Sequence, residues 1–275
     1  MISGQAMFVH LYSLSARVAG CAAFAASLAA CGPSQAELKA QREKADYHYQ
    51  LAYGFYFEKP GQGGNPEAAL VEALRALEAD ETHAEAHFLA GLISMGREQF
   101  VDAERHYRRA IELKPDFYFA KNNLGATYIA MARWDDAIKE FEALVQTPFY
   151  TTPGNGHNNL GWAYYQKGDH EKARHHLTVA IQVAPTLCPA YNNLGLVLLE
   201  DKVEERAEKY LGEAVKRCPE YAEPHFHLGR LYARRADEAR ASASYRRCLE
   251  LSDGTPLGDR CRRPLASVNG EVIHD

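Results

Sequence analysis

The sequence predicts an all-α protein, a right-handed superhelical solenoid of about six helix-turn-helix repeats. The first observation is the tetrapeptide Asn-Asn-Leu-Gly, which occurs three times, starting at Asn122, Asn158 and Asn192. These copies start 36 and 34 residues apart, and an alanine follows the glycine of each copy by twelve residues. A constant period with small residues at fixed positions indicates stacked units, each of which contacts only its neighbours.

A period near 34 residues is typical of tetratricopeptide (TPR) helical hairpins. Position 8 is glycine in five of the six units, position 20 is alanine in all six and position 27 is alanine in four. Two helices approach closely at these positions, and a larger side chain would push them apart. A proline near position 32 ends the second helix. The six repeats are expected to start at Ala45, Ala84, Tyr118, Gly154, Cys188 and Ala222.

Four segments are therefore expected. Residues 1–30 form a signal peptide, residues 31–44 a tether, residues 45–255 the six repeats, and residues 256–275 a tail. Two loops exceed the period. The loop at 59–66, inside the first repeat, is about five residues too long and rich in glycine and proline, and the loop at 147–154, after the third repeat, is two residues too long.

Composition gives no sign of catalysis or of nucleic-acid binding. The 275 residues are 47% hydrophobic and 24% charged, and the net charge of −5 provides no basic footprint. The sequence has no Gly-rich phosphate loop, nucleophile elbow or His-Glu-x-x-His motif. We expect a binding protein rather than an enzyme, with no cofactor, because the repeats leave only about twenty residues for an added site.

Histidine is common but does not form a metal-binding pattern. Four repeats have histidine at position 4, where many such repeats have tryptophan: His48, His87, His157 and His225. The doublet His175-His176, and His225 with His227, have no clustered acid or thiol beside them, so packing or surface exposure explains them better than a metal site.

The N-terminus is typical of exported proteins. Residues 1–30 contain no acid and one arginine, Arg17, which precedes a short apolar run. The run is shorter than the ~20 residues of a membrane span. Residues 28–31 read Leu-Ala-Ala-Cys and resemble a bacterial lipobox, in which Cys31 is acylated and becomes the first residue. An ordinary Ala-x-Ala cleavage site beside a chance cysteine is the alternative. Gly32, rather than aspartate, favours the outer membrane.

Export places the remaining cysteines in an oxidising compartment. Four remain after Cys21 and Cys31: Cys188, Cys218, Cys248 and Cys261. They allow three connectivities. Cys188 opens a first helix and Cys218 follows its antiparallel partner, so both lie at one end of a hairpin and a bridge between them is favoured. The remaining pair would staple the tail to the last repeat.

The first helices are expected to line the concave face. Helical spacing directs positions 2, 5, 9 and 12 into the groove, while positions 7, 8 and 11 pack inward. In the central repeats these positions are apolar, aromatic or amide residues: Phe119, Asn122, Ala126, Ile129, Asn158, Trp162, Tyr165, Asn192, Leu196 and Leu199. Such a groove suits a peptide or an amphipathic helix, and Trp162 is the best candidate for a binding hot spot.

A packing role is the alternative for each of these positions. Asparagine at position 6 is expected to make local hydrogen bonds, because polar groups on close helix faces satisfy their neighbours. Partner binding is favoured for Trp162 and Tyr165, since contiguous exposed apolar surface marks interaction sites. The basic end formed by Arg230, Arg234 and Arg235 is either a site for an acidic segment or a solvated face.

The passage between the third and fourth repeats resembles one protein family. Asn-Asn-Leu-Gly at 122–125 and Phe141 are followed by Pro-x-Tyr-x-Thr-Pro at 148–153 and then by Asn159-x-Gly161. With the lipobox and six repeats, this pattern is similar to the type IV pilus biogenesis lipoproteins of the PilF, PilW and Tgl family. The Gly-rich loop at 60–65 and the four late cysteines do not fit the family pattern.

The resemblance implies an outer-membrane lipoprotein that faces the periplasm, binds secretin subunits and promotes their localisation and multimer assembly. The acyl chains would hold it at the bilayer. Two alternatives are a TPR scaffold lipoprotein of another envelope machine, such as outer-membrane protein assembly, and an accessory subunit of an envelope enzyme.

Overall fold

The computed structural model describes residues 33–57 and 64–268. This part of the chain contains 13 helices and no strand, which confirms the all-α prediction. The predicted signal peptide, Cys31 and most of the Gly-rich loop lie outside the described residues. Among the helices that are described, none combines the length and the apolar character needed to span a bilayer.

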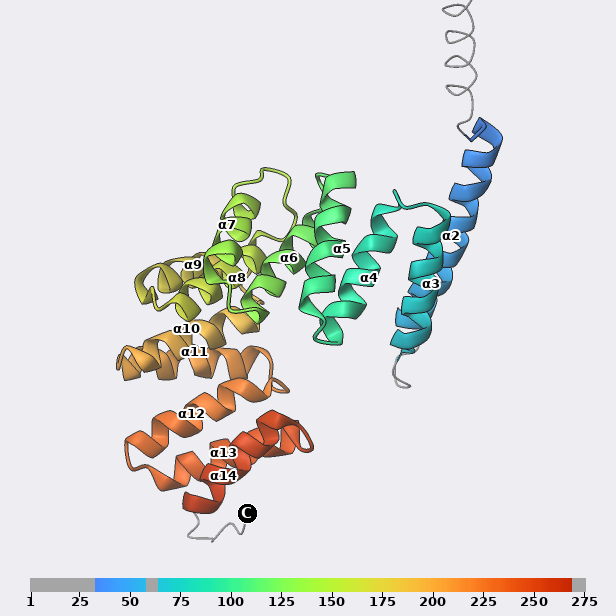
Figure 1. Cartoon of the computed structure of the whole chain (residues 1–275). Helices are drawn as coiled ribbons and strands as arrows, with labels where there is room; N and C mark the ends of the chain where they lie inside the picture. The colour runs from blue at the N-terminus through green and yellow to red at the C-terminus, as the bar shows by residue number, and fades with distance from the viewer. Residues whose placement is uncertain (1–32, 58–63, 269–275) are drawn as a thin grey trace, which may run out of the picture.

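Six antiparallel hairpins stack into an arc, and a closing helix follows the last one (Figure 1). The helices are α2 (Gln35–Phe57), α3 (Pro66–Ala79), α4 (Ala84–Gly96), α5 (Phe100–Leu113), α6 (Tyr118–Ala130), α7 (Trp134–Val145), α8 (Pro153–Lys167), α9 (His170–Val183), α10 (Cys188–Glu200), α11 (Glu204–Arg217), α12 (Ala222–Arg234), α13 (Glu238–Ser252) and α14 (Pro256–Val268).

The helices α2, α4, α6, α8, α10 and α12 are the first helices of the hairpins. Each contacts the first helix of the next hairpin, whereas the described second helices contact only the helices directly before and after them. First helices therefore lie closer together than second helices do. This difference in spacing curves the stack and places the first helices on its inner face.

The first helix is longer than predicted. α2 begins at Gln35, inside the segment 31–44 that was expected to be a tether. Its start is fixed by a capping box, in which the backbone N–H of Ser34 donates to Glu37 Oε2 at 2.7 Å and the backbone N–H of Glu37 donates to Ser34 Oγ at 3.2 Å. The tether prediction was therefore wrong from Gln35 onward.

The predicted tail is also mostly helical. α14 covers residues 256–268, begins with a proline in its first turn and packs against α13 and α12. It occupies the place that the first helix of a seventh repeat would take. The 34-residue period is lost after Asp253 because a single closing helix follows the two-helix repeats. The folded chain continues through that helix.

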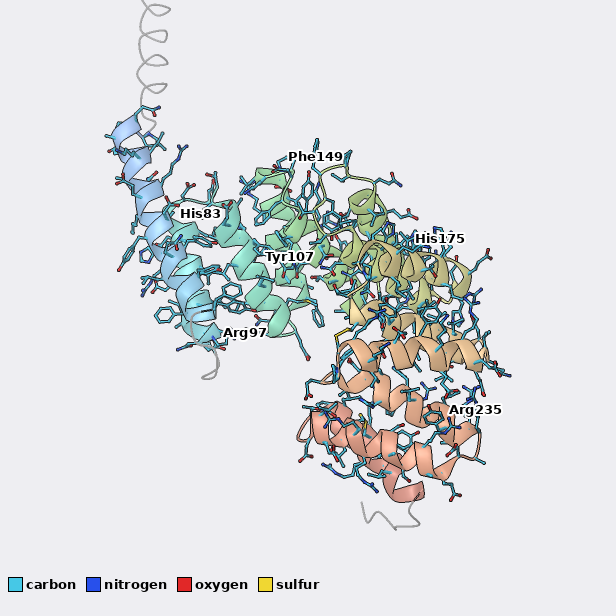
Figure 2. The ribbon with its side chains drawn as sticks, turned by 180° about the vertical axis from the view of Figure 1, so that it is seen from behind. His83, Arg97, Tyr107, Phe149, His175 and Arg235 are labelled. Atoms are coloured by element: carbon cyan, nitrogen blue, oxygen red, sulfur yellow. A yellow bond between two sulfur atoms is a disulfide. The ribbon has the colours of Figure 1, made fainter. Side chains whose placement is uncertain are left out.

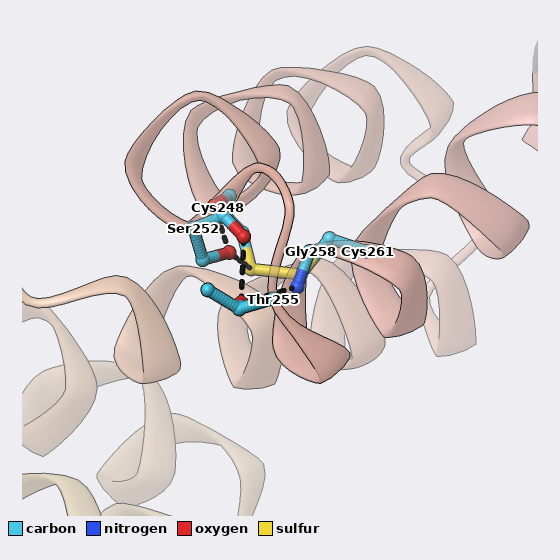
Figure 3. The surroundings of a disulfide bond; sticks show 5 residues. All are labelled: Cys248, Ser252, Thr255, Gly258 and Cys261. Carbon is cyan, nitrogen blue, oxygen red and sulfur yellow. Dashed lines mark hydrogen bonds between the residues drawn. A yellow bond between two sulfur atoms is a disulfide. The ribbon is translucent and has the colours of Figure 1, made fainter.

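Both predicted disulfides are present. Cys248 in α13 is bonded to Cys261 in α14, with their Cα atoms 6.1 Å apart (Figure 3). The turn between these helices is held by the Ser252 hydroxyl, which donates to the Cys248 carbonyl at 2.7 Å, and by the Thr255 hydroxyl, which donates to the Ser252 carbonyl at 2.6 Å. The disulfide thus ties the closing helix to the last hairpin.

The second disulfide joins the two ends of one hairpin. Cys188 is the first residue of α10, and Cys218 directly follows α11; their Cα atoms lie 6.3 Å apart. Antiparallel helices bring these two positions together, which is the geometry on which the prediction rested.

Position 8 explains how tightly each hairpin closes. In five repeats this residue is glycine, and a Cβ atom there would lie 2.6 to 2.7 Å from the large side chain at position 24. The pairs are Gly91–Tyr107, Gly125–Phe141, Gly161–Leu177, Gly195–Leu211 and Gly229–Tyr245. The first repeat instead has Ala52 at position 8 and Ala73 at position 24, both fully buried. Glycine opposite a large residue and alanine opposite alanine fill similar space.

Each of the last five hairpins turns through a left-handed residue at position 15. This residue is Gly168 in the fourth repeat, with φ of 89°, but Glu98, Ala132, Lys202 and Ala236 in the others, with φ between 55° and 61°. A side chain costs about 1 kcal/mol or more in this conformation. The stacking of the hairpins outweighs that local cost.

Candidate partner-binding surface

The predicted aromatic pair lies on α8 at the inner face. The rings of Trp162 and Tyr165 lie 5.1 Å apart with an interplanar angle of 35°, and both side chains are partly exposed. Tyr165 also contacts the ring of His170, 5.4 Å away in α9. These contacts restrict the rotamers of both aromatic side chains, so the pair is held in place before any partner binds.

The neighbouring helix α6 adds apolar surface to this pair. Phe119 is 60% exposed, and Ile129, nearly three turns further along, is partly exposed. Phe119 is far more exposed than the core residues of the same helix, such as Leu124 at 3%. The inner face of α6 and α8 therefore presents apolar side chains that no described element covers.

The asparagines form a ladder that connects three first helices. Asn159 Nδ2 donates to Asn122 Oδ1 at 3.0 Å, from α8 to α6, and Asn193 Nδ2 donates to Asn158 Oδ1 at 3.0 Å, from α10 to α8. Within each helix, Asn158 donates to Asn159 and Asn192 donates to Asn193. The ladder fixes the spacing of the repeats along the inner face.

These bonds settle two predictions about the amides. Of the asparagines at position 6, Asn123 donates locally to the Phe119 carbonyl at 2.8 Å, as expected, whereas Asn159 and Asn193 donate to the first helix of the preceding repeat. Asn158 and Asn192 are only 9% and 4% exposed, so they belong to the ladder and are not a free row of amides for a partner backbone. Asn122 remains partly exposed.

Two predicted groove residues lie in the core. Leu196 is 7% exposed and Leu199 is fully buried. Helical spacing predicted an accessible surface at these two positions, but their burial shows that neighbouring side chains cover them. The accessible apolar groove therefore ends near α8.

The groove extends further toward the N-terminus than predicted. On α2, the rings of Tyr49 and Tyr53 lie 6.2 Å apart, and those of Tyr53 and Phe57 lie 4.6 Å apart. Tyr53 and Phe57 are 43% and 48% exposed. Tyr49 and Tyr53 occupy positions 5 and 9, so extending the register to the first repeat would have identified them. Phe88 and Leu92 occupy the same positions on α4.

The inserted loop before α8 exposes another aromatic side chain. Tyr150 is buried at 9% exposure and contacts the Tyr118 ring at 6.1 Å, which anchors the loop. The adjacent Phe149 is 78% exposed and points outward (Figure 2). Gly156 is needed beneath the anchor, because a Cβ there would lie 2.7 Å from the Tyr150 ring. The loop is therefore rigid at Tyr150 and presents Phe149 to solvent.

The basic end is neutralised by the chain itself. Arg230 pairs with Glu200 at 2.8 Å, and Arg235, labelled in Figure 2, pairs with Glu204 at 2.9 Å and with Glu208. Arg234 donates to the Leu199 carbonyl at 3.1 Å. These bonds join α12 to α10 and α11. The interpretation as a paired, solvated face is the one that the geometry supports.

Two hairpins pair histidines inside the helix interface. The Nδ1 atoms of His87 and His106 lie 3.1 Å apart, and those of His157 and His176 lie 3.2 Å apart. His87 Nε2 donates to the Glu81 carbonyl, so in the neutral ring Nδ1 accepts a hydrogen bond from the Nδ1–H of His106. Burial, followed by the neighbouring Arg105, lowers the pKa of His106 to about 4. In the part of the chain described, no group of three or more metal-ligating side chains occurs.

The repeats also match known sequence models. Models described as tetratricopeptide repeat match residues 84–117, 154–187 and 222–254. These matches begin at three of the predicted repeat starts, Ala84, Gly154 and Ala222. Together with the stacked hairpins, they define the molecule as an all-α TPR solenoid.

Solved structures with this fold include PilF, PilW and Tom70. PilF of Pseudomonas aeruginosa is 20% identical with a TM-score of 0.64, and the match covers 82% of this chain and 99% of PilF. PilW, a widely conserved type IV pilus biogenesis factor, is 20% identical with a TM-score of 0.68, over 80% of this chain and 98% of PilW. Yeast Tom70 is 14% identical with a TM-score of 0.63, and the match covers 82% of this chain and 47% of Tom70. No curated protein sequence is significantly similar.

Proposed function

We propose that this chain is a lipid-anchored outer-membrane protein, facing the periplasm, that binds secretin subunits and promotes their assembly into the multimer used by type IV pili. The observation that carries the proposal is the inner face of α6 and α8, where Phe119 is exposed and the packed pair Trp162 and Tyr165 is partly exposed. A solenoid with this surface is a binding module rather than a catalyst.

The choice of partner is supported by similarity rather than by contacts. PilF and PilW share this fold over nearly their whole lengths, and the name of PilW is that of a type IV pilus biogenesis factor. The inserted loop at 147–154, with its anchored Tyr150, is the feature that sets this chain apart from a regular TPR array. Acylation at Cys31 stays a prediction from the sequence, since that residue lies outside the described part.

The mechanism follows from anchoring and from the groove. Acyl chains on Cys31 would hold the solenoid at the bilayer. A secretin segment bound in the groove would then meet the membrane and other subunits at a high effective concentration. An apolar or amphipathic segment suits the aromatic pair, because aromatic anchors dominate binding energy when a partner shields them from water.

The groove is tested by the double variant Trp162→Ala with Tyr165→Ala. We expect secretin co-purification to fall at least tenfold and heat-resistant secretin multimer to fall with it, because a central aromatic anchor contributes about 2 kcal/mol or more. Val101→Ala is the matched control, since Val101 is 73% exposed on the second helix α5. Unchanged co-purification in the double variant would exclude the groove as the site.

The function as a whole is tested in a strain that lacks the protein. Loss of secretin multimer, restored by the wild-type chain but less well by Cys31→Ala, is the expected result. If the multimer is unchanged and barrel-assembly subunits are recovered with the protein instead, the chain is a scaffold of that machine.

A further inference from the structure

The N-terminal end of the solenoid exposes residues at positions that are buried in the other repeats, apart from the partly exposed Tyr232. Positions 3, 7 and 11 of a first helix face the second helix of the preceding hairpin. At position 7, Leu124, Leu160 and Leu194 are at most 3% exposed, and at position 11 Tyr128 and Leu198 are at most 1% exposed. The equivalent interface of α2 has no preceding hairpin among the described residues.

On α2 these positions hold large apolar side chains. Tyr47, Leu51 and Phe55 are 62%, 36% and 43% exposed. They are spaced four residues apart, so they form one stripe along the helix. Terminal repeats of solenoids normally have a polar outer face, because an apolar face at the end would otherwise meet water. The stripe therefore indicates that something covers this end.

A helix of the ordinary repeat type does not fit there. In the other five repeats, position 3 is small, which lets the preceding helix approach: Ala86, Ala120, Gly156, Ala190 and Pro224, all buried. In α2, position 3 is Tyr47. A covering helix must therefore bring small residues of its own to this point, just as glycine faces a large side chain inside each hairpin.

The chain supplies such a helix. The first ten residues of α2, which were expected to be a tether, project past α3 (Figure 1) and are almost wholly exposed. Their residues Ala36 and Ala40 lie on the same side of α2 as Tyr47 and Leu51, within about 60° at about 100° per residue. One continuous stripe thus runs along α2, with small side chains at its start and large side chains at its end.

We propose that α2 pairs with α2 of a second copy of this chain, antiparallel and about a two-fold axis. In this register Ala36 of each copy faces Leu51 of the other, and Ala40 faces Tyr47. The same register places Glu43 beside Lys44 of the other copy, twice, at the two-fold axis. The pairing is self-complementary in size and in charge, as an isologous interface must be.

This pairing accounts for two features with one contact. It covers the apolar stripe that continues the inter-repeat interface, and it gives the projecting start of α2 a surface to pack on. A helix that is exposed on all sides gains little stability from its own residues. The pairing of two α2 helices covers the end of the solenoid and leaves the groove open, so it is independent of secretin binding.

The test is disulfide cross-linking of the full chain in cells that express it. Lys44→Cys places one new thiol near the two-fold axis, and we expect a reducible species of twice the protein's mass. Lys139→Cys, exposed on the second helix α7, is the matched control and should give no such species. Adding Leu51→Asp or, separately, Tyr47→Asp to Lys44→Cys should lower the cross-linked fraction at least tenfold.

Tyr47 is mostly exposed within one copy, so Tyr47→Asp reports on pairing without disturbing the hairpin. The proposal is overturned if neither Lys44→Cys nor Glu43→Cys gives the double-mass species, or if both aspartate variants leave it unchanged. A cross-linked product of another mass also overturns it, because a different protein would then cover this end.

Discussion

The two terminal hairpins of the solenoid differ in whether their outer faces are covered. An internal hairpin packs between two neighbours, whereas a terminal hairpin has only one. At the C-terminal end, α14 takes the place of the missing neighbour, and a disulfide between Cys248 and Cys261 holds it there. At the N-terminal end no described helix precedes α2, and Tyr47 and Phe55 stay exposed.

The cores beneath these ends differ as well. The N-terminal core is built from alanines, including Ala52, Ala69 and Ala73, together with Leu89 and Ile93 of α4. The C-terminal core contains larger side chains and a cross-link: Phe226, Tyr245, Cys248 and Cys261. Small side chains bury less apolar area and so contribute less stability. The first hairpin should therefore open most readily, and the last hairpin owes its resistance to α14 and its disulfide.

The largest expected effect comes from removing the closure at the C-terminal end. In the double variant Cys248→Ser with Cys261→Ser, we expect a loss of about 3 kcal/mol, because the cross-link no longer restricts the unfolded chain. Amide exchange of α14 should then approach that of α2. In the matched variant Cys188→Ser with Cys218→Ser, protection of α14 should persist. Unchanged protection of α14 in the first variant would show that packing alone closes this end.

A second prediction concerns how the last hairpin is filled. Gly229→Ala places a Cβ 2.6 Å from the Tyr245 ring, and we expect it to destabilise the protein by about 1–3 kcal/mol in chemical denaturation. Gly212→Ala is the control, because nothing lies within 4 Å of a Cβ there and alanine favours the helix by about 0.5–1 kcal/mol.

The partner residue provides a check on this explanation. In a Tyr245→Ala background, Gly229→Ala should cost much less than it does in the wild-type chain, because the first repeat already combines Ala52 with the small Ala73. Equal effects of Gly229→Ala and Gly212→Ala would exclude the steric cause.

Much of this architecture was predictable because close packing restricts residue size. The register of glycine and alanine gave the hairpins, and antiparallel geometry gave the pairing of Cys188 with Cys218. The early start of α2 was also readable, since Ser34 and Glu37 have capping-box spacing. α14 was missed because a lone closing helix repeats no pattern, although Leu257, Cys261 and Leu265 are spaced as on one helix face.

The site was less predictable, because exposure depends on neighbouring repeats. Tyr165 and Leu199 both occupy position 12 of first helices, yet only Tyr165 stays partly exposed, whereas Leu199 is fully buried. The hydrogen bond from Asn193 to Asn158 depends on the distance between two first helices, and the sequence alone does not give that distance. Residue type gave the chemistry of the surface, but stacking decided which side chains form it.

The third prediction concerns pH. Burial lowers the pKa of His227, at the C-terminal end, to about 3, and the nearby Arg230 and Arg260 act in the same direction. The unfolded value is about 6.5. Between these values the unfolded chain binds more protons than the folded chain, so stability should fall as the pH drops below 6.5.

His227→Leu isolates this contribution. The wild-type chain should lose on the order of 1–2 kcal/mol more than this variant between pH 7 and pH 5. Denaturant titrations at the two pH values measure the difference. Parallel losses in both proteins would assign the acid sensitivity to other groups, such as the His87–His106 pair nearer the N-terminal end.

The smallest effect is expected at the open end. Tyr47→Ser should change the free energy of unfolding by less than about 0.5 kcal/mol in dilute solution, because Tyr47 is 62% exposed and its removal leaves no cavity. Tyr128→Ser, at a side chain that is 1% exposed, should cost about 3 kcal/mol or more.

The dependence of the unfolding midpoint on protein concentration separates the two reasons for a small effect of Tyr47→Ser. If α2 pairs between copies, the wild-type midpoint rises with protein concentration and that of Tyr47→Ser does not, since only the folded chain can pair. If both midpoints are independent of concentration, the aromatic stripe is an uncovered end, and the contrast between the two ends is one of stability alone.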